Sequence, residues 1–467
     1  MSRGNELAKN TIILFVGIFF TKVLQYLLLP IYTSFLTTAE YGKYELCNTV
    51  VTLLLPFIGL QVDQGVFRFL INSRDNKVEI KKIVSSSLFF VCISILFYLL
   101  IFILLYRFIV DSYKWLIVIN VAFCSLSSLF LQISRGIGNN KEYAISNFLI
   151  SLLTIVFNLI FVIGIGLKVD GLLYGGAIGY FVGIVYLFFK IKLFHYLSFR
   201  SIDINVLKKI ISYSLPMIPN SISWWIFSSS DRIIITSYIG LSATGILSIA
   251  YKFSNVLIII YNIFNMSLTE SISLHIEDKD IDDYFNEIFT KIGNIFVTLG
   301  VLVISFMPLI FNLLINKAYF EAYNMIPIAV IATIMQVYAG MLGTIYVANN
   351  NTKSIAMTSI LSAIVNILID LLLVSHVGIY AAVISTLVSF IVLYCYRIND
   401  VRKKYFDIKI SKEFAVSIIF LIIIAVIFYT NNKFILFLSM VISLVFSIII
   451  NKKNIKFILS FIKRKKV

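Results

Sequence analysis

Long apolar runs recur along nearly the whole sequence, and only short polar breaks separate them. About 20 residues of helix, each rising about 1.5 Å, cross the roughly 30 Å hydrocarbon core of a bilayer. Because a backbone in lipid must satisfy its own hydrogen bonds, each run is expected to be a helix. We therefore predict an all-α polytopic membrane protein with about fourteen spans, near residues 10–34, 45–66, 83–106, 115–134, 143–166, 170–190, 213–238, 243–271, 293–315, 322–347, 355–375, 378–396, 413–430 and 434–450.

The composition excludes an ordinary soluble domain, because 60% of the 467 residues are hydrophobic and only 13% are charged. The four cysteines lie in apolar runs without a CxxC spacing, and the three histidines are far apart in the sequence. These patterns indicate neither a disulfide framework nor a metal site, and we expect no cofactor.

The lysines and arginines predict the orientation, since cytoplasmic loops of membrane proteins are rich in them. With a cytoplasmic N-terminus, most of the 39 basic residues fall on the cytoplasmic side, and the basic C-terminal tail lies there too. The first span has no clear cleavage site after it and is interpreted as a retained anchor. The net charge of +16 is explained by attraction to anionic membrane lipids, so we expect no nucleic-acid partner.

The two halves of the sequence resemble each other at an offset of a little over 200 residues. Three pairs of segments match in register: Ala39–Asn48 with Ser242–Tyr251, Gly138–Lys141 with Ala348–Lys353, and Asn158–Ile178 with Asn366–Ile384. We predict two pseudo-repeated six-helix lobes around a central cavity, residues 1–200 and 201–410, followed by a C-terminal helix pair with a basic tail, residues 411–467.

Three basic residues lie within predicted spans, namely Lys22, Arg232 and Lys252. A charged side chain at membrane depth is costly unless it is paired or faces a water-filled cavity. We interpret all three as candidate substrate-binding cations, because cations in a cleft of low dielectric constant bind an anion strongly.

Further polar residues are candidates for lining the cavity or for coupling transport to an ion: Gln25, Asp63, Arg68, Asp231, Asn255, Asn366 and Asp370. Asp370, one helical turn after Asn366, could bind a proton or a sodium ion, although its place near the end of a predicted span also fits a plain interfacial acid. Asp231 could instead be a counter-ion for Arg232 or Lys252. Stripes of Ser, Thr and Asn on these helices also fit ordinary contacts between helices.

One stretch resembles a known signature. The sequence DRIIITSYIGLSATGILSIAYK (Asp231–Lys252) resembles the signature of the Wzx-type polysaccharide flippases of the MOP exporter superfamily. Leu7–Leu46 and Gly59–Leu70 are similar to the opening of the same family. Gln61 stands where the family's second motif usually has an acid, and the acid here is Asp63.

The resemblance implies a flippase that moves a polyprenyl-pyrophosphate-linked oligosaccharide repeat unit from the cytoplasmic to the outer leaflet by alternating access. It further implies a bacterial inner membrane, a role in O-antigen or capsule export, and polysaccharide assembly proteins as candidate partners. A multidrug or toxin cation antiporter of the same superfamily is the alternative. A membrane-embedded glycan polymerase is less favoured, because the predicted outer loops are short and no nucleophile with an adjacent base is visible, so we expect no enzyme.

Overall fold

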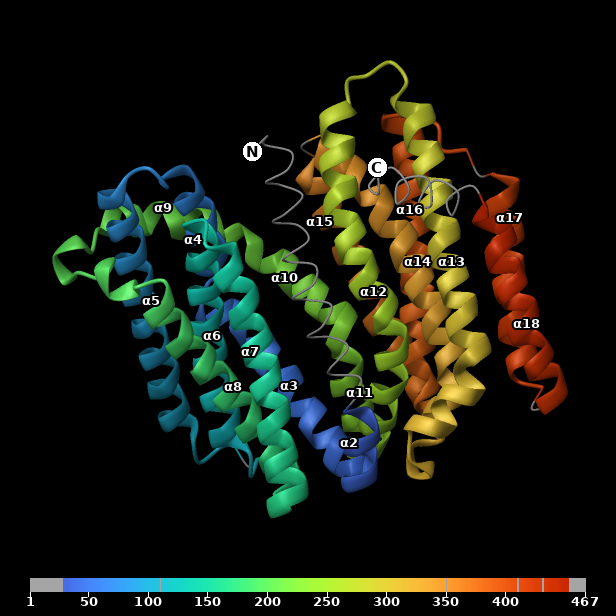
Figure 1. Ribbon diagram of the computed structural model, residues 1–467, viewed down its shortest axis with the longest axis horizontal. Coiled ribbons are helices and arrows are strands. Elements are labelled where there is room, and N and C mark those ends of the chain that lie inside the picture. The colour runs from blue at the N-terminus through green and yellow to red at the C-terminus, as the bar shows by residue number, and fades with distance from the viewer. Residues whose placement is uncertain (1–27, 110, 350, 410, 431, 453–467) are drawn as a thin grey trace, which may run out of the picture. The chain divides into compact units, whose positions relative to one another are not determined.

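Helices make up every regular element in the part of the chain that the structure, a computed structural model, describes: residues 28–109, 111–349, 351–409, 411–430 and 432–452 (Figure 1). The expectation of an all-α fold is thus confirmed. The chain divides into two compact units, of which the first ends at Ser229 and the second begins at Ser230. The division predicted at residues 200 and 410 stays a prediction, and each unit is described by itself.

The first unit consists of long helices followed by a series of short ones. The elements in chain order are α2 (Leu29–Phe35), α3 (Thr38–Ile58), α4 (Val62–Asn72), α5 (Lys77–Leu105), α6 (Lys114–Gly136), α7 (Asn140–Leu159) with its π-helical extension η1 (Ile160–Ile165), α8 (Lys168–Lys190), η2 (Leu193–His195), η3 (Phe199–Ser201), α9 (Ile204–Ser214), η4 (Leu215–Met217) and α10 (Ile218–Trp225). The π-helix η5 (Ile226–Ser230) leads to the second unit.

The core of the first unit forms where α4 packs against α5, α6 and α9. Val62, Val66 and Leu70 recur every four residues on α4, so they share one face, and each is fully buried. Gly65 on the same helix lets α9 approach closely, because a Cβ there would lie 3.1 Å from the Ile210 carbonyl oxygen. The polar residues of α4 consequently face away from this apolar core.

Asp203 fixes the start of α9 to α5. Its carboxylate accepts hydrogen bonds from the backbone N–H groups of Asn205 and Val206 and from Lys82 at 3.1 Å. The Lys82 ammonium is the main reason why the pKa of Asp203 lies below its usual range. The connection between α5 and α9 is therefore an N-cap and an ion pair combined.

The second unit contains α11 (Asp231–Tyr238), α12 (Leu241–His275), α13 (Ile281–Leu314), η6 (Lys317–Tyr319), α14 (Glu321–Ala348), α15 (Thr352–Val377), α16 (Tyr380–Lys404), α17 (Lys412–Phe428) and α18 (Lys433–Ile450). Its centre is α14, which packs against α12, α13 and α16 and is the most buried candidate span in the described chain. The last two helices, α17 and α18, pack against α13.

Ten described helices are long and apolar enough to cross a membrane, and the pair α3 and α4 together forms an eleventh candidate. The predicted count of fourteen is not confirmed. Most of the first predicted span lies outside the described residues, and α17, where the thirteenth was predicted, has only 17 residues.

Two predicted spans are not continuous helices. The span at 45–66 bends by 53° between α3 and α4, and the span at 213–238 is broken into η4, α10, η5 and α11. Pro56 lies in the last turn of α3, while Pro216 and Pro219 lie in the second break. Proline removes a backbone donor and clashes with the preceding turn of a helix. Hydrophobicity alone does not report this effect, so it wrongly predicted one continuous helix in each of these two spans.

Candidate functional site

Five polar residues from four helices of the second unit meet in its interior. This carboxylate cluster consists of Asp231 on α11, Tyr251 on α12, Asn366 and Asp370 on α15, and Thr386 on α16. Asp231 is 2% exposed, and both Asn366 and Asp370 are completely buried. Since acids are rarely buried without an ionic partner, two of them in one helix bundle mark a candidate functional site.

The Asp231 carboxylate is held by neutral donors. Its Oδ2 accepts hydrogen bonds from the Tyr251 hydroxyl at 2.7 Å and from the Thr386 hydroxyl at 3.0 Å. The Asn366 carboxamide lies between Oδ1 of Asp231 and the backbone N–H of Thr386. In the orientation that satisfies both groups, its nitrogen donates to Asp231 Oδ1 and its oxygen accepts from the Thr386 N–H, each at 3.3 Å. Asp231 therefore ties α11 to α12, α15 and α16.

The alternative that Asp231 is a counter-ion for Arg232 or Lys252 stays a prediction, since the Arg232 charge acts on the Asp231 carboxylate while the hydrogen bonds of that carboxylate come from neutral groups. Arg232 follows Asp231 in sequence, but its Nε donates to the Ser248 hydroxyl on α12 at 3.1 Å. Successive residues of a helix point about 100° apart, so the two side chains leave the helix in different directions.

Asp370 differs from Asp231 because neither of its carboxylate oxygens has a hydrogen-bond partner in the described structure. It lies one turn after Asn366 on α15, close enough to Asp231 for the two charges to interact. The interpretation of Asp370 as a plain interfacial acid is wrong, because the neighbouring helices exclude it from the surface completely.

The chemistry of the cluster suits a proton or a small hard cation. An ionised carboxylate without a donor is very costly to bury, and either a bound proton or a bound cation removes that cost. Oxygen ligands, which hard cations prefer, come from the two carboxylates, the Asn366 amide, the Thr386 hydroxyl and the Ala382 carbonyl, which already accepts from Tyr251 at 3.2 Å. The described residues contain no group of three or more His, Cys, Asp or Glu side chains that could hold a metal ion.

The other predicted site residues of the second unit lie on α11 and α12. Arg232 is 9% exposed, Lys252 is half-buried and Asn255 is exposed. Lys22 and Gln25 lie outside the described residues. The structure thus brings Asp231, Asn366 and Asp370 together.

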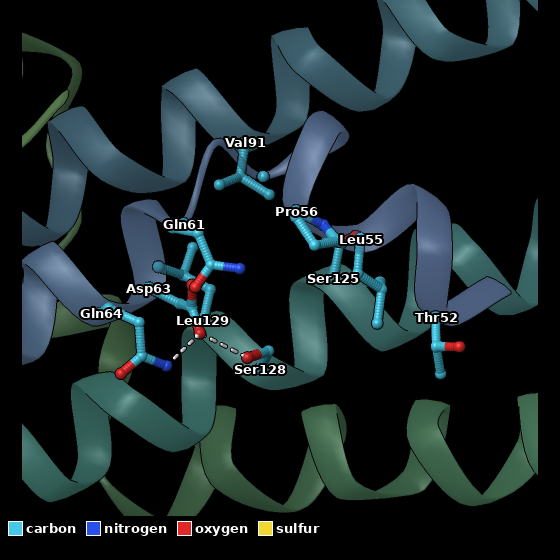
Figure 2. A pocket seen from close by; sticks show the side chains of 11 residues that line it. Thr52, Leu55, Pro56, Gln61, Asp63, Gln64, Val91, Ser125, Ser128 and Leu129 are labelled. Carbon is cyan, nitrogen blue, oxygen red and sulfur yellow. Dashed lines mark hydrogen bonds between the residues drawn. The ribbon is translucent and has the colours of Figure 1, made fainter. Parts of the chain in front are cut away.

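The first unit has a polar pocket of about 240 Å³ at the bend between α3 and α4 (Figure 2). Its polar lining consists of Thr52, Gln61, Asp63, Gln64, Ser125 and Ser128. Asp63 accepts hydrogen bonds at Oδ2 from the Ser128 hydroxyl at 2.8 Å and from the Gln64 amide at 3.0 Å. The predicted candidate Asp63 therefore lines a real pocket, whereas Arg68, further along α4, is exposed.

Sequence reasoning missed three residues of the second unit. Tyr251 and Thr386 complete the carboxylate cluster, and only the packing of α12 and α16 against α11 reveals them. Arg397 directly follows the predicted span 378–396, a place that predicts a basic side chain at the cytoplasmic surface, but it is 3% exposed. The buried face of α16, which includes Phe390, Leu393 and Tyr394, continues through Arg397 at helical spacing, and this pattern could have shown that it points inward.

The Arg397 guanidinium joins α16 to two neighbouring helices through neutral acceptors. It donates to the Ala339 carbonyl oxygen at 2.8 Å, and to the hydroxyls of Thr358 and Ser359 at 3.1 Å each. Three acceptors in a fork geometry suit a guanidinium better than an ammonium. Arg397 thus holds α14, α15 and α16 together.

Comparisons with known proteins agree with this architecture. Residues 7–272 match the family model described as polysaccharide biosynthesis protein. Comparison with curated protein sequences gives no match.

Solved structures of MOP superfamily transporters share the fold. The lipid II flippase MurJ in an inward closed conformation is similar with a TM-score of 0.72 and 17% identity, over 96% of this chain and 100% of that chain. A multidrug resistance MATE family transporter of the MOP superfamily in an inward-facing conformation is similar with a TM-score of 0.68 and 14% identity, over 82% of this chain and 96% of that chain. A MOP superfamily transporter from Pyrococcus furiosus gives a TM-score of 0.59 and 16% identity, over 84% of this chain and 96% of that chain. The chain is thus a multi-pass membrane protein with the fold of this superfamily, which confirms the resemblance read from its sequence.

Proposed function

Because the chain belongs to the polysaccharide biosynthesis protein family, we propose that it is a flippase for a polyprenyl-pyrophosphate-linked oligosaccharide. The substrate moves from the cytoplasmic to the outer leaflet of the bacterial inner membrane by alternating access, for surface polysaccharide assembly, and both termini are cytoplasmic. The observation that carries the proposal is the family match, joined to a fold shared along 96% of the chain with a protein named as a lipid II flippase.

The pyrophosphate group gives the substrate a compact negative charge, which basic residues at membrane depth can bind. Lys22, Arg232 and Lys252 are the proposed binding cations. Arg232 belongs to the second unit, where its Nε donates a hydrogen bond to the Ser248 hydroxyl at 3.1 Å and the residue is 9% exposed. The polyprenyl tail can stay in the lipid throughout.

We propose that the carboxylate cluster couples transport to a proton or sodium gradient. Asp231 and Asp370 cannot both remain ionised at full burial without compensation, so a cation that enters would change the energy of the second unit. A ligand drives a conformational change only through its different affinity for two states. The cluster meets this requirement if its four helices pack differently once the cation has left.

The transport test uses purified protein in liposomes with the organism's own lipid-linked repeat unit, fluorescently labelled, and an impermeant quencher added outside. The wild-type protein should make the label in the inner leaflet accessible to the quencher. The rate at which the label becomes accessible should fall by about tenfold in each of three variants, Lys22→Ala, Arg232→Ala and Lys252→Ala, because each loses one charged contact with the substrate.

The matched control is Lys279→Ala, since Lys279 is exposed in the turn after α12 and should have no effect. Surface glycan in a strain without the wild-type gene checks the same variants in cells. Normal rates in all well-expressed variants of the three cations would contradict the anion-binding account.

A multidrug or toxin cation antiporter is the second candidate, favoured by two observations. The acidic cluster could hold a cation, and the fold matches a MATE family transporter over 82% of the chain. Protection of a drug-sensitive strain by the wild-type protein but not by Asp370→Asn would favour this candidate over the flippase. A glycan polymerase would instead lengthen the lipid-linked substrate in the same liposomes, and we expect its length to stay unchanged.

A further inference from the structure

The pocket at the bend between α3 and α4 has a strained backbone at its edge. Leu60 and Gln61 have φ angles of 46° and 55°, in the left-handed region that favours glycine. Such strain persists only where the surroundings impose it, and it is common at ligand sites. Here it turns the Gln61 amide into the pocket, beside Asp63 (Figure 2).

Several polar groups in this pocket have hydrogen-bonding capacity left over. The Ser125 hydroxyl is buried, with 8% of the residue exposed, and has no partner. Among the described residues, none bonds to the Gln61 amide or to Oδ1 of Asp63. Buried polar groups are nearly always satisfied, so the buried Ser125 hydroxyl, together with the half-buried Gln61 amide and Asp63 Oδ1, gives this pocket the capacity to hydrogen-bond a ligand.

The lining has the chemistry of a site for a neutral polyhydroxyl compound. Asp63 Oδ1 can accept a hydrogen bond, the Gln61 amide can donate and accept, and the Ser125 hydroxyl can do both. Leu55, Pro56, Val91 and Leu129 supply apolar surface for the C–H face of a ring. No lysine, arginine or histidine is among the described lining residues, so the carboxylate would repel a phosphate.

The size of the pocket limits the ligand to one ring. The pocket has a volume of about 240 Å³. This is below the range of roughly 300–1,000 Å³ that is typical of pockets for drug-sized ligands. A whole oligosaccharide does not fit.

We propose that this pocket binds one neutral sugar ring, a hexopyranose or its N-acetylated form, of the transported glycan. Asp63 accepts from one ring hydroxyl, Gln61 and Ser125 bond to its neighbours, and the apolar wall contacts the ring carbons. The proposal rests on the proposed function and deepens it, because the first unit would then recognise the glycan while the cations recognise the pyrophosphate.

The test measures binding of single sugars to the full-length protein in nanodiscs by saturation-transfer NMR. The probes are the methyl glycosides of glucose, galactose, mannose, rhamnose and N-acetylglucosamine, with glucose 6-phosphate as a charged comparison. At least one neutral glycoside should bind with millimolar affinity, and the phosphate ester should not. Asp63→Asn should weaken the binding by about tenfold and Ser125→Ala by about threefold.

Ser127→Ala is the matched control. Ser127 lies on the same helix, is 2% exposed and also has an unpartnered hydroxyl, but it does not line the pocket. It should bind the glycoside as the wild-type protein does, which separates loss of a pocket contact from loss of a buried hydroxyl. Each variant is first shown to keep the wild-type thermal unfolding midpoint to within a few degrees.

No saturation transfer to any neutral glycoside would overturn the proposal, and so would wild-type affinity in both Asp63→Asn and Ser125→Ala. Binding that is lost equally in Ser127→Ala would also overturn it. The liposome assay run on the same preparation separates the two ideas: active flipping without sugar binding contradicts only the pocket, and sugar binding without flipping contradicts only the transport function.

Discussion

Asp370 carries the most unusual chemistry of any described residue, because its carboxylate is completely buried and without a hydrogen-bond donor. Asp231, a short distance away, has three neutral donors. Two acids of the same type thus have opposite environments in one cluster. Asp370, which has no donor, therefore gains more from a bound proton or cation than Asp231 does.

Replacing Asp370 should remove ion-dependent stabilisation. If sodium binds at the cluster, raising sodium to 100 times its dissociation constant stabilises the folded wild-type protein by about 2.7 kcal/mol. Asp370→Asn should lose this stabilisation by sodium. In the absence of sodium, the variant should be at least as stable as the wild-type protein, because the uncompensated acid is gone. The measurement is the thermal unfolding midpoint in sodium chloride and in choline chloride at equal ionic strength.

The control for this prediction is Asp278→Asn. Asp278 is an exposed acid in the turn after α12, and its side chain is 52% exposed. It should keep the full sodium shift. If the wild-type protein shows no sodium shift, a proton is the expected ligand, and the same comparison is made between pH 6 and pH 8. A shift in Asp370→Asn as large as that of the wild-type protein under both conditions would rule out the cluster as the coupling site.

At the scale of the helices, small residues determine how closely neighbours approach. On α8, Gly175 and Gly179 face α7, where a Cβ would lie 2.0 Å from Asn158 Oδ1 and 2.7 Å from the Ile150 carbonyl oxygen, respectively. In lipid there is little hydrophobic force between helices, so close backbone contact of this kind contributes strongly to their association. The first unit therefore depends on glycines that a hydropathy pattern does not distinguish from its other apolar residues.

Gly179→Ala should destabilise the protein by about 1–3 kcal/mol, because the backbone carbonyl that it meets cannot rotate away as a side chain can. Gly164→Ala is the control, since nothing lies within 4 Å of the added methyl group. The two variants are compared by their unfolding midpoints in detergent. Equal stability of the two would show that α7 and α8 can separate at little cost.

At the scale of the whole molecule, two compact units built from apolar helices need a defined orientation in the bilayer. The basic residues predict that the segment 191–212 is cytoplasmic and that the turn containing η6 is outside. Arg200 in the first and Lys317 in the second are both exposed, so each can be replaced by a reporter.

Cysteine labelling tests this orientation. In a variant with all four native cysteines replaced by serine, Lys317→Cys should react with a membrane-impermeant maleimide in intact cells, whereas Arg200→Cys should react only after the cells are opened. The Cys-free parent is the control for background labelling. The reverse pattern would place the N-terminus outside and would invert the proposed direction of transport.

The fold class follows from the sequence alone, because runs of about 20 apolar residues leave the backbone no alternative to helices in lipid. The sequence also identified Asp231, Asn366 and Asp370 as candidates, since polar residues are conspicuous in apolar runs. It could not show that the three meet, because Asp231 lies 135 residues before Asn366. Nor could it supply Tyr251 and Thr386, which are ordinary helix residues until packing turns their hydroxyls toward Asp231.

The roles of the remaining residues became visible only in the packed structure. The structure showed Arg397 to be a buried connection between helices, and it turned the predicted second span into a bent pair with a pocket beside Asp63. The physical reason is the same in each case. Hydrophobicity reports whether a residue can leave water, whereas hydrogen-bond partners and close backbone approach depend on which other helix lies opposite, and that information is spread over the whole chain.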